Sequence, residues 1–303
     1  MAVYLRLFDT ELQYNNARSN DYYEPWTSLV LENSGVSFNK SEEEKLLATP
    51  LTFEITSDGN IRWKTSSTAG TRTIEYKKND GEWTSITSTT GDSASSISVV
   101  SGDTVQFRGN NSSYSNVSYT ISFSASTAGF KLSGNIMSLI KSSGFEMENT
   151  LSSGRTFLGL FRACTGLTDA SQLILPATTL ADSCYRDMFG GCTSLTTAPE
   201  LPATILANYC YHQMFIRCTS LTTAPELPAT TLANYCYNEM FRACSKLNYI
   251  KCLATSVSAT NCKSNWVYGV ASSGTFVKSP NITESTWGRS NSGIPSNWTV
   301  QDA

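Results

Sequence analysis

The sequence predicts a multidomain, β-rich fold in which a β-sandwich is followed by a short α/β solenoid. Two observations predict it. Residues 50–128 contain short runs that alternate apolar and polar residues between turns containing Gly and Asp. Further along, one stretch recurs every 26 residues, as the positions of Cys184, Cys210 and Cys236 show. A fixed period in the twenties is typical of a solenoid, whose units bury their apolar faces against one another.

Residues 1–49 are expected to form an extended anchoring segment and no free-standing domain. They are rich in aromatic residues without a clear period, and Pro25 argues against a central helix. Ser41, followed by three Glu residues, predicts the start of a helix. The aromatic content favours docking onto another protein; the alternative is a segment that wraps over the next domain. The candidate docking residues are Tyr4, Phe8, Tyr22, Tyr23 and Trp26.

Residues 50–128 are expected to form a β-sandwich that resembles an immunoglobulin or fibronectin-like module. The turns Asn79-Asp-Gly81 and Ser101-Gly-Asp103 predict two hairpins, over 73–86 and 97–107. Trp63 and Trp83 are expected in the core; the alternative is an exposed face that stacks on sugars. Strands are predicted at 51–55, 61–63, 73–76, 83–86, 97–100, 105–107 and 119–123.

Three further segments complete the expected domain organisation. Apolar runs in residues 129–163 predict a cap for the open end of the solenoid, because a stack of repeats exposes its last apolar face. Residues 164–265 are the repeats. Within one repeat, Leu206, Cys210, Met214 and Cys218 follow one another at helical spacing, so a helix is predicted there. Residues 266–303 are expected to form a C-terminal cap of short strands.

The repeats resemble a known family. Their shared element reads Met188-Phe-Gly-Gly-Cys192-Thr-Ser-Leu195, Met214-Phe-Ile-Arg-Cys218-Thr-Ser-Leu221 and Met240-Phe-Arg-Ala-Cys244-Ser-Lys-Leu247. It resembles the Ala-Phe-x-x-Cys-x-x-Leu element of BspA-like leucine-rich-repeat proteins, although the period is longer and Met replaces Ala. The resemblance implies a leucine-rich-repeat fold for about a third of the chain. It does not imply one function, because that family includes adhesins, other surface proteins and phage-encoded proteins.

The whole arrangement, through to the ending Gly293-Ile-Pro-Ser-Asn-Trp-Thr-Val-Gln-Asp-Ala, resembles proteins of Bacteroidales and of their phages. Charged residues interrupt the N-terminal apolar run, so no signal peptide is predicted. We therefore expect a virion protein made in the host cytoplasm: a head or tail fibre, or a capsid decoration protein. Its expected partners are capsid or tail proteins through the N-terminal segment, and a host-surface glycan or protein. A homo-oligomer is expected, with a trimer as a guess. The alternatives are a BspA-like adhesin on a bacterial surface and, more remotely, a glycan-active enzyme.

Composition restricts the classes of partner. The net charge is −3, which argues against a nucleic-acid binder because such proteins concentrate Lys and Arg. No run of about 18 apolar residues is present, so no membrane insertion is expected.

The nine cysteines begin at Cys164 and most fall into two ladders with the repeat period. They are interpreted as small buried hydrophobic residues; disulfides between coils and metal binding are the alternatives. His212 is the sole histidine, so neither a nucleophile–His pair nor a tetrahedral metal site is expected. Glu200 and Glu226 recur one repeat apart and are interpreted as solvated acids, not as a glycosidase pair. No catalytic residue, metal or cofactor is predicted.

Positions that differ between copies are the best candidates for recognition, because packing does not dictate them. A tyrosine that follows the cysteine in every copy could add an aromatic stripe that stacks on sugars or contacts a protein; the alternative is that the rings cover the seam between repeats. The candidate recognition surface is Tyr185, Arg186, Asp187, Tyr211, His212, Gln213, Tyr237, Asn238 and Glu239.

Overall fold

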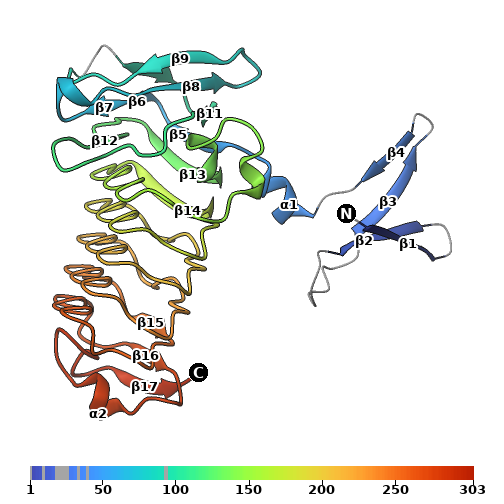
Figure 1. The fold of residues 1–303 in the computed structure, drawn as a ribbon. Coiled ribbons are helices and arrows are strands. Elements are labelled where there is room, and N and C mark those ends of the chain that lie inside the picture. The colour runs from blue at the N-terminus through green and yellow to red at the C-terminus, as the bar shows by residue number, and fades with distance from the viewer. Residues whose placement is uncertain (1, 9–10, 18–26, 33–34, 39–40, 92–94) are drawn as a thin grey trace. The chain divides into compact units, whose positions relative to one another are not determined.

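The computed structural model describes residues 2–8, 11–17, 27–32, 35–38, 41–91 and 95–303 (Figure 1). The chain divides into two compact units, Met1–Ala48 and Thr49–Ala303. Strands outnumber the short helices in both, so the expectation of a β-rich multidomain chain is confirmed. Within the described ranges, no helix is both long and apolar enough to cross a membrane.

The first unit is a four-stranded antiparallel sheet. Strands β1 (Ala2–Phe8), β2 (Glu11–Ala17), β3 (Thr27–Glu32) and β4 (Gly35–Phe38) pair in chain order. Helix α1 (Glu42–Leu47) follows, and the helix start predicted at Ser41 is confirmed by a capping box with Glu44. The expectation that this segment forms no domain of its own is wrong. Consecutive antiparallel strands need only short connections to pair, and no long-range period is required for that.

The second unit begins with a six-stranded sheet in the order β14-β13-β5-β11-β8-β9. Strand β6 (Gly59–Arg62) pairs with β10 (Ser96–Val99), and β7 (Lys64–Thr65) pairs with β12 (Ile121–Ser122). The fully buried Phe53, Phe107 and Phe123 pack together, with ring centroids 4.8–5.1 Å apart. The six strands are β5 (Leu51–Ser57), β8 (Thr73–Lys78), β9 (Thr84–Thr87), β11 (Thr104–Arg108), β13 (Gly129–Asn135) and β14 (Leu167–Ile174).

Of the two predicted hairpins, one is confirmed. Strands β8 and β9 pair antiparallel as expected. The second hairpin is wrong, because β10 pairs with β6 while β11 pairs with β5 and β8. The turn between them carries the chain from one sheet to another. A turn signal between two apolar runs fixes a reversal of direction, but it does not decide whether the flanking strands bond to each other.

The two tryptophans of this region have different surroundings. Trp63 is fully buried, as expected, and donates from Nε1 to the carbonyl of Arg72 at 3.0 Å. Trp83 is only half-buried, so its expected core position is wrong. The Arg108 guanidinium lies 4.1 Å from its ring centroid and the Lys77 ammonium lies 5.6 Å from it. Both cations lie within the range of cation–π contacts with the ring.

Strand β13 joins the sheet to the repeats, because it pairs antiparallel with β5 and parallel with β14. Two 3-10 turns, η2 (Ile136–Leu139) and η3 (Phe145–Met147), lie between these strands in sequence. From β14 onward the chain runs through stacked layers (Figure 1). The layers end in three parallel strands, β15 (Tyr249–Cys252), β16 (Thr275–Lys278) and β17 (Thr299–Asp302), with helix α2 (Glu284–Trp287). The short strands expected after residue 266 are therefore confirmed.

The backbone hydrogen bonds of each repeat alternate in a regular way. Between residues 183 and 192, every second N–H bonds within the layer, as from Cys184 to the carbonyl of Ala181 at 3.2 Å. The residues between them donate to the next layer, as from Tyr185 to the carbonyl of Cys210 at 3.0 Å. The same alternation recurs from 209 to 218. Half of the amides in this segment therefore hold neighbouring repeats together.

This segment is not the helix that the spacing predicted. Three residues in each layer, four positions apart, adopt left-handed backbone angles. In one layer they are Tyr209, Gln213 and Arg217, with φ of 57°, 57° and 61°. A right-handed helix has negative φ throughout and bonds each N–H to the fourth residue before it, so it cannot contain this pattern. Apolar residues spaced four apart fit both structures, and the sequence period could not separate them.

Candidate functional site

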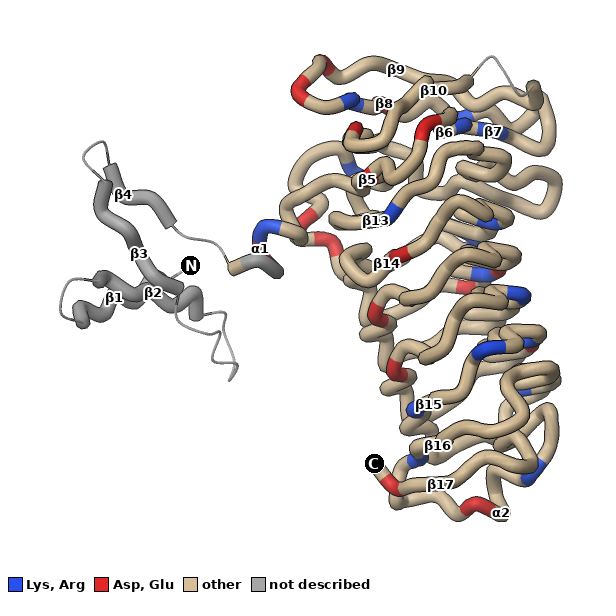
Figure 2. The backbone as a smooth tube through the Cα atoms, turned by 180° about the vertical axis from the view of Figure 1, so that it is seen from behind, with Lys and Arg blue, Asp and Glu red and all other residues tan. Residues whose placement is uncertain are grey.

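The turn segment of each repeat has a period of four residues. Two buried side chains alternate with two that face outward or are only partly covered. In the first full repeat, Cys184, Tyr185, Met188 and Phe189 are buried. Figure 2 shows basic residues recurring along the edge of the layers that carries these segments. The outward residues on this edge include five of the positions predicted for recognition: Arg186, Asp187, Gln213, Asn238 and Glu239.

The predicted aromatic stripe lies inside the protein. Tyr185, Tyr211 and Tyr237 are only 1%, 2% and 1% exposed. Successive rings stack with centroids 5.9 and 6.1 Å apart, and the column continues to Phe157 and Trp266. Burial raises the pKa of all three hydroxyls. The rings therefore fill the seam between repeats, as the second interpretation held, and these tyrosines do not belong to the candidate recognition surface.

A second aromatic column lies beside the first and is bonded to the cysteines. Phe161, Phe189, Phe215 and Phe241 stack with centroids 5.4–5.7 Å apart. Each thiol of one cysteine ladder donates to a phenylalanine carbonyl of the preceding layer, as from Cys218 Sγ to Phe189 O at 3.1 Å. The same bond runs from Cys192 to Phe161 and from Cys244 to Phe215, at 3.1 and 2.9 Å.

All nine cysteines are buried and unpaired, which confirms their interpretation as packing residues. Burial raises the pKa of the Cys192 thiol to about 12 and that of Cys218 well above its usual range. Both remain protonated at neutral pH. They therefore act as hydrogen-bond donors inside the stack and not as nucleophiles.

Apart from His212, the remaining predicted recognition residues are partly exposed, and some of them are linked from layer to layer. Gln213 Nε2 donates to Glu239 Oε2 at 2.7 Å, and Glu239 also pairs with Arg242 at 2.9 Å. Asp187 pairs with Arg162 at 3.0 Å. Arg186 and Asn238 are half-buried as well. These residues form a polar column along the turn segments, with contacts between layers from Arg162 to Asp187 and from Gln213 to Glu239.

His212 lies in the same column but is only 9% exposed. Its Nδ1 is buried without a hydrogen-bond partner. Desolvation, and then the positive charge of Arg186, lower its pKa to about 4, although Glu239 opposes this. The imidazole is therefore neutral at physiological pH. It packs edge-on against Tyr209, with ring centroids 5.7 Å apart, so its place on an exposed surface is not confirmed.

Two half-exposed tyrosines were missed by the sequence reasoning. Tyr209 and Tyr235 stack with centroids 4.5 Å apart, and the Arg186 guanidinium lies 6.0 Å from the centroid of Tyr209. The equivalent residues in neighbouring repeats are Ser183 and Asn261. Variation between copies was the signal used elsewhere, and it would have identified this position too.

A cleft of about 430 Å³ opens beside the first full repeat. It lies where the residues around β7 and β12 meet the turn segments that contain Arg162 and Asp187. Among the residues that the structure describes, its charged lining residues are Lys64, Arg162 and Asp187. Its hydroxyl-bearing lining residues are Thr65, Ser66, Thr90, Thr120, Ser122 and Ser124.

The acidic pair singled out in the sequence lies along a different, shallow groove. Glu200 and Glu226 line it together with Leu201, Pro202 and Pro228. Both carboxylates belong to exposed residues, and Glu226 pairs with Lys251 at 2.9 Å. No group of three or more His, Cys, Asp or Glu in the described ranges is placed to hold a metal ion.

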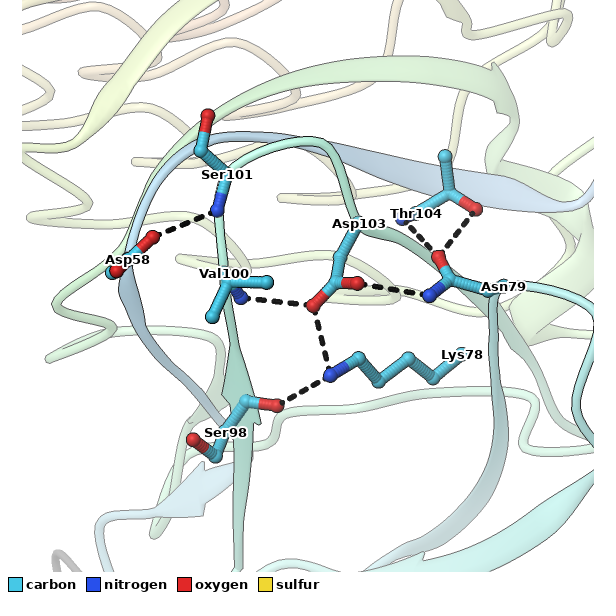
Figure 3. Close-up of polar contacts among 8 residues, drawn as sticks. All are labelled: Asp58, Lys78, Asn79, Ser98, Val100, Ser101, Asp103 and Thr104. Atoms are coloured by element: carbon cyan, nitrogen blue, oxygen red, sulfur yellow. Dashed lines mark hydrogen bonds and ion pairs between the residues drawn. The ribbon is translucent and has the colours of Figure 1, made fainter.

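A polar network holds the turn between β10 and β11 (Figure 3). One carboxylate oxygen of Asp103 accepts the Val100 N–H at 2.8 Å and pairs with Lys78 at 2.8 Å. The other accepts from Asn79 Nδ2 at 2.8 Å. These hydrogen bonds, with that to Lys78 the largest, lower the pKa of Asp103 to about 2. Both oxygens of the carboxylate accept hydrogen bonds that hold this turn, so this network is structural.

Two of the predicted docking residues, Tyr4 and Phe8, lie in β1. Tyr22, Tyr23 and Trp26 lie outside the described residues. Comparison with known proteins identifies no relative: no family model, no curated protein and no solved structure matches the chain.

Proposed function

We propose that this chain is a non-enzymatic display protein of a phage virion, either a head or tail fibre or a capsid decoration protein. The observation that carries the proposal is the division into a small unit, Met1–Ala48, and a large one, Thr49–Ala303. A small sheet with its own hydrogen-bonded register suits docking on a particle, where capsid or tail proteins are the partners. The large unit is then the displayed part, offered to a host-surface glycan or protein.

We further propose that the large unit combines an immunoglobulin-like β-sandwich with a short solenoid of the leucine-rich-repeat kind. The hydrogen bonds between layers support the solenoid, because residues about one repeat apart bond in series, as Tyr185 to Cys210, Tyr211 to Cys236 and Tyr237 to Cys262. In this proposal the left-handed turn segment takes the place of the helix found in other leucine-rich repeats. The parallel pair β13–β14 makes one continuous body of sandwich and solenoid.

The chemistry of the titratable residues supports a non-enzymatic role. His212 is neutral and nearly enclosed, and the thiols have raised pKa values. Glu200 and Glu226 belong to exposed residues along a shallow groove. Enzymes that cleave glycosidic bonds instead hold two carboxyl groups on either side of an enclosed bond.

Mass spectrometry of purified particles tests the proposal. The chain should be present at a constant copy number per particle after washing in high salt. Absence from particles, together with an in-frame signal peptide upstream in the genome, would instead support a bacterial adhesin. Light scattering of the purified protein tests the homo-oligomer separately, with a trimer as the expected mass for a fibre.

A further inference from the structure

We propose that the cleft between the β7–β12 region and the first full repeat binds a sugar that carries a carboxylate, such as a uronic or sialic acid residue of a surface glycan. The inference rests on the proposed display role, to which it adds a site and a class of ligand. Three observations carry it: the lining of the cleft, the exposed Arg162 at its edge, and Gly190, whose lack of a side chain makes room for Asp187.

The first observation is a set of hydroxyl groups with protons left to donate. Ser66 Oγ accepts the Thr120 N–H at 2.9 Å, and this bond does not use the proton of Ser66. Ser122 and Ser124 bond to each other at 2.7 Å through one of their two protons, which leaves the other for a ligand. A volume of about 430 Å³ falls in the range of small-ligand sites. Polyhydroxylated ligands are the class that such a lining satisfies.

The second observation is the ion pair at the edge of the cleft. Arg162 uses Nε to pair with Asp187 Oδ2 at 3.0 Å, while its side chain remains 65% exposed. The two terminal NH₂ groups of this guanidinium therefore stay accessible, in a fork that fits a carboxylate. A guanidinium placed in this way favours an anionic sugar over a neutral one.

The third observation is that this repeat differs from the other copies at two neighbouring positions. A Cβ atom on Gly190 would lie 1.9 Å from Asp187 Oδ1, so the glycine is required for the position of this carboxylate. The equivalent residues in the next two repeats are Ile216 and Arg242, and there Gln213 and Glu239 replace Asp187. No hydrogen bond reaches Oδ1 from the described part of the chain. It is therefore available to accept a bond from a sugar hydroxyl.

Titration calorimetry with the full purified chain tests the inference, with methyl glucuronide as the acidic probe and methyl glucoside as its neutral match. The chain should bind the glucuronide saturably and the glucoside at least about tenfold more weakly, because the glucoside lacks the group that Arg162 contacts. Arg162→Gln should weaken glucuronide binding by about tenfold or more, and Arg162→Lys should restore it only in part. The matched control is Arg242→Gln, at the same repeat position three layers away, and it should leave binding unchanged.

Equal binding of both sugars, or equal effects of Arg162→Gln and Arg242→Gln, would overturn the proposed site. No heat of binding with either probe would also overturn it. Because Arg162 is exposed, the variant should keep the far-ultraviolet circular dichroism of the parent, so loss of binding cannot be confused with loss of folding. The measurement needs no particle. A failure to bind the sugar would overturn the proposed site without testing the display role. Absence of the chain from particles would overturn the display role without changing the binding result.

Discussion

One substitution should change the stability of the protein in opposite directions in a left-handed turn segment and in a helix. Ala243 has φ of 61°, and the equivalent positions of neighbouring repeats are Arg217 and, in the last layer, Gly269 with φ of 75°. A residue with a Cβ atom pays roughly 1–2 kcal/mol in this conformation, and glycine pays none of it. Glycine loses about 0.5–1 kcal/mol through its greater freedom in the unfolded chain. Ala243→Gly should therefore stabilise the protein by about 0.5–1 kcal/mol.

Urea unfolding followed by tryptophan fluorescence measures this change. The matched control is Ala207→Gly, because Ala207 lies in the same kind of repeat but has negative φ. The control should lose about 0.5–1 kcal/mol, so the two substitutions should move the unfolding midpoint in opposite directions. In a helix both would be destabilising, by about 1 kcal/mol each. A loss of stability in Ala243→Gly equal to that in Ala207→Gly would refute the left-handed conformation.

Three further changes test the packing and the charges. Phe215→Ala should cost about 3–5 kcal/mol in urea unfolding, because the ring is fully buried between Phe189 and Phe241; a cost under about 1 kcal/mol would contradict the stack. Cys218→Ser should lower the free energy of unfolding by only about 1 kcal/mol, because a hydroxyl can still donate to Phe189 O. Cys218→Val should lower it more, because valine overpacks the site and leaves that carbonyl without a donor. Since the pKa of Asp103 is lowered from 3.8 to about 2, its carboxylate stabilises the fold above about pH 4 and this contribution is lost as the pH falls through 2. Asp103→Asn should therefore melt at a lower temperature than the parent at pH 7, and this difference should shrink towards pH 2; a difference that does not change with pH would contradict the network.

His212 and Asp187 should affect stability in opposite directions over the same pH range. The pKa of His212 is lowered from 6.5 to about 4, because its burial favours the neutral imidazole. The contribution of this neutral form to the stability of the fold is therefore complete above pH 6.5 and is lost as the pH falls to 4. The pKa of Asp187 is raised from 3.8 to about 6, so protonation favours the folded state over nearly the same interval. Thermal melts of His212→Gln between pH 4 and 7 should show less acid destabilisation than the parent. A larger acid effect in this variant would contradict the burial of the imidazole.

The sequence predicted those parts of the fold that depend on local pattern. The helix start at Ser41, the hairpin of β8 and β9, the short strands after residue 266 and the burial of the cysteines are confirmed. Each depends on a few neighbouring residues or on the type of side chain. The pairing of β10 with β6 was missed because strand partners are set by distant contacts that no turn signal records. The helix of the repeats was wrong because the apolar spacing is the same for a helix and for a turn with a period of four.

The candidate recognition surface was predicted in part. Differences between copies correctly identified Arg186, Asp187, Gln213, Asn238 and Glu239 as partly exposed. The position of Tyr185 and its equivalents was left open, because a tyrosine that recurs with the period can line either an exposed face or a seam; the structure shows the seam. The cleft could not be predicted at all. It combines residues of β7, β12 and the first full repeat, and the sequence does not show that these segments meet.

Particle incorporation of separate pieces tests most directly the claim that the first unit docks and the second is displayed. A reporter protein fused to residues 1–48, and residues 49–303 alone, would each be produced during infection and measured by mass spectrometry in purified particles. The account predicts that the reporter enters particles at the copy number of the full chain and that residues 49–303 stay out, while folding normally. Residues 49–303 in particles, or none of the full chain in them, would contradict it.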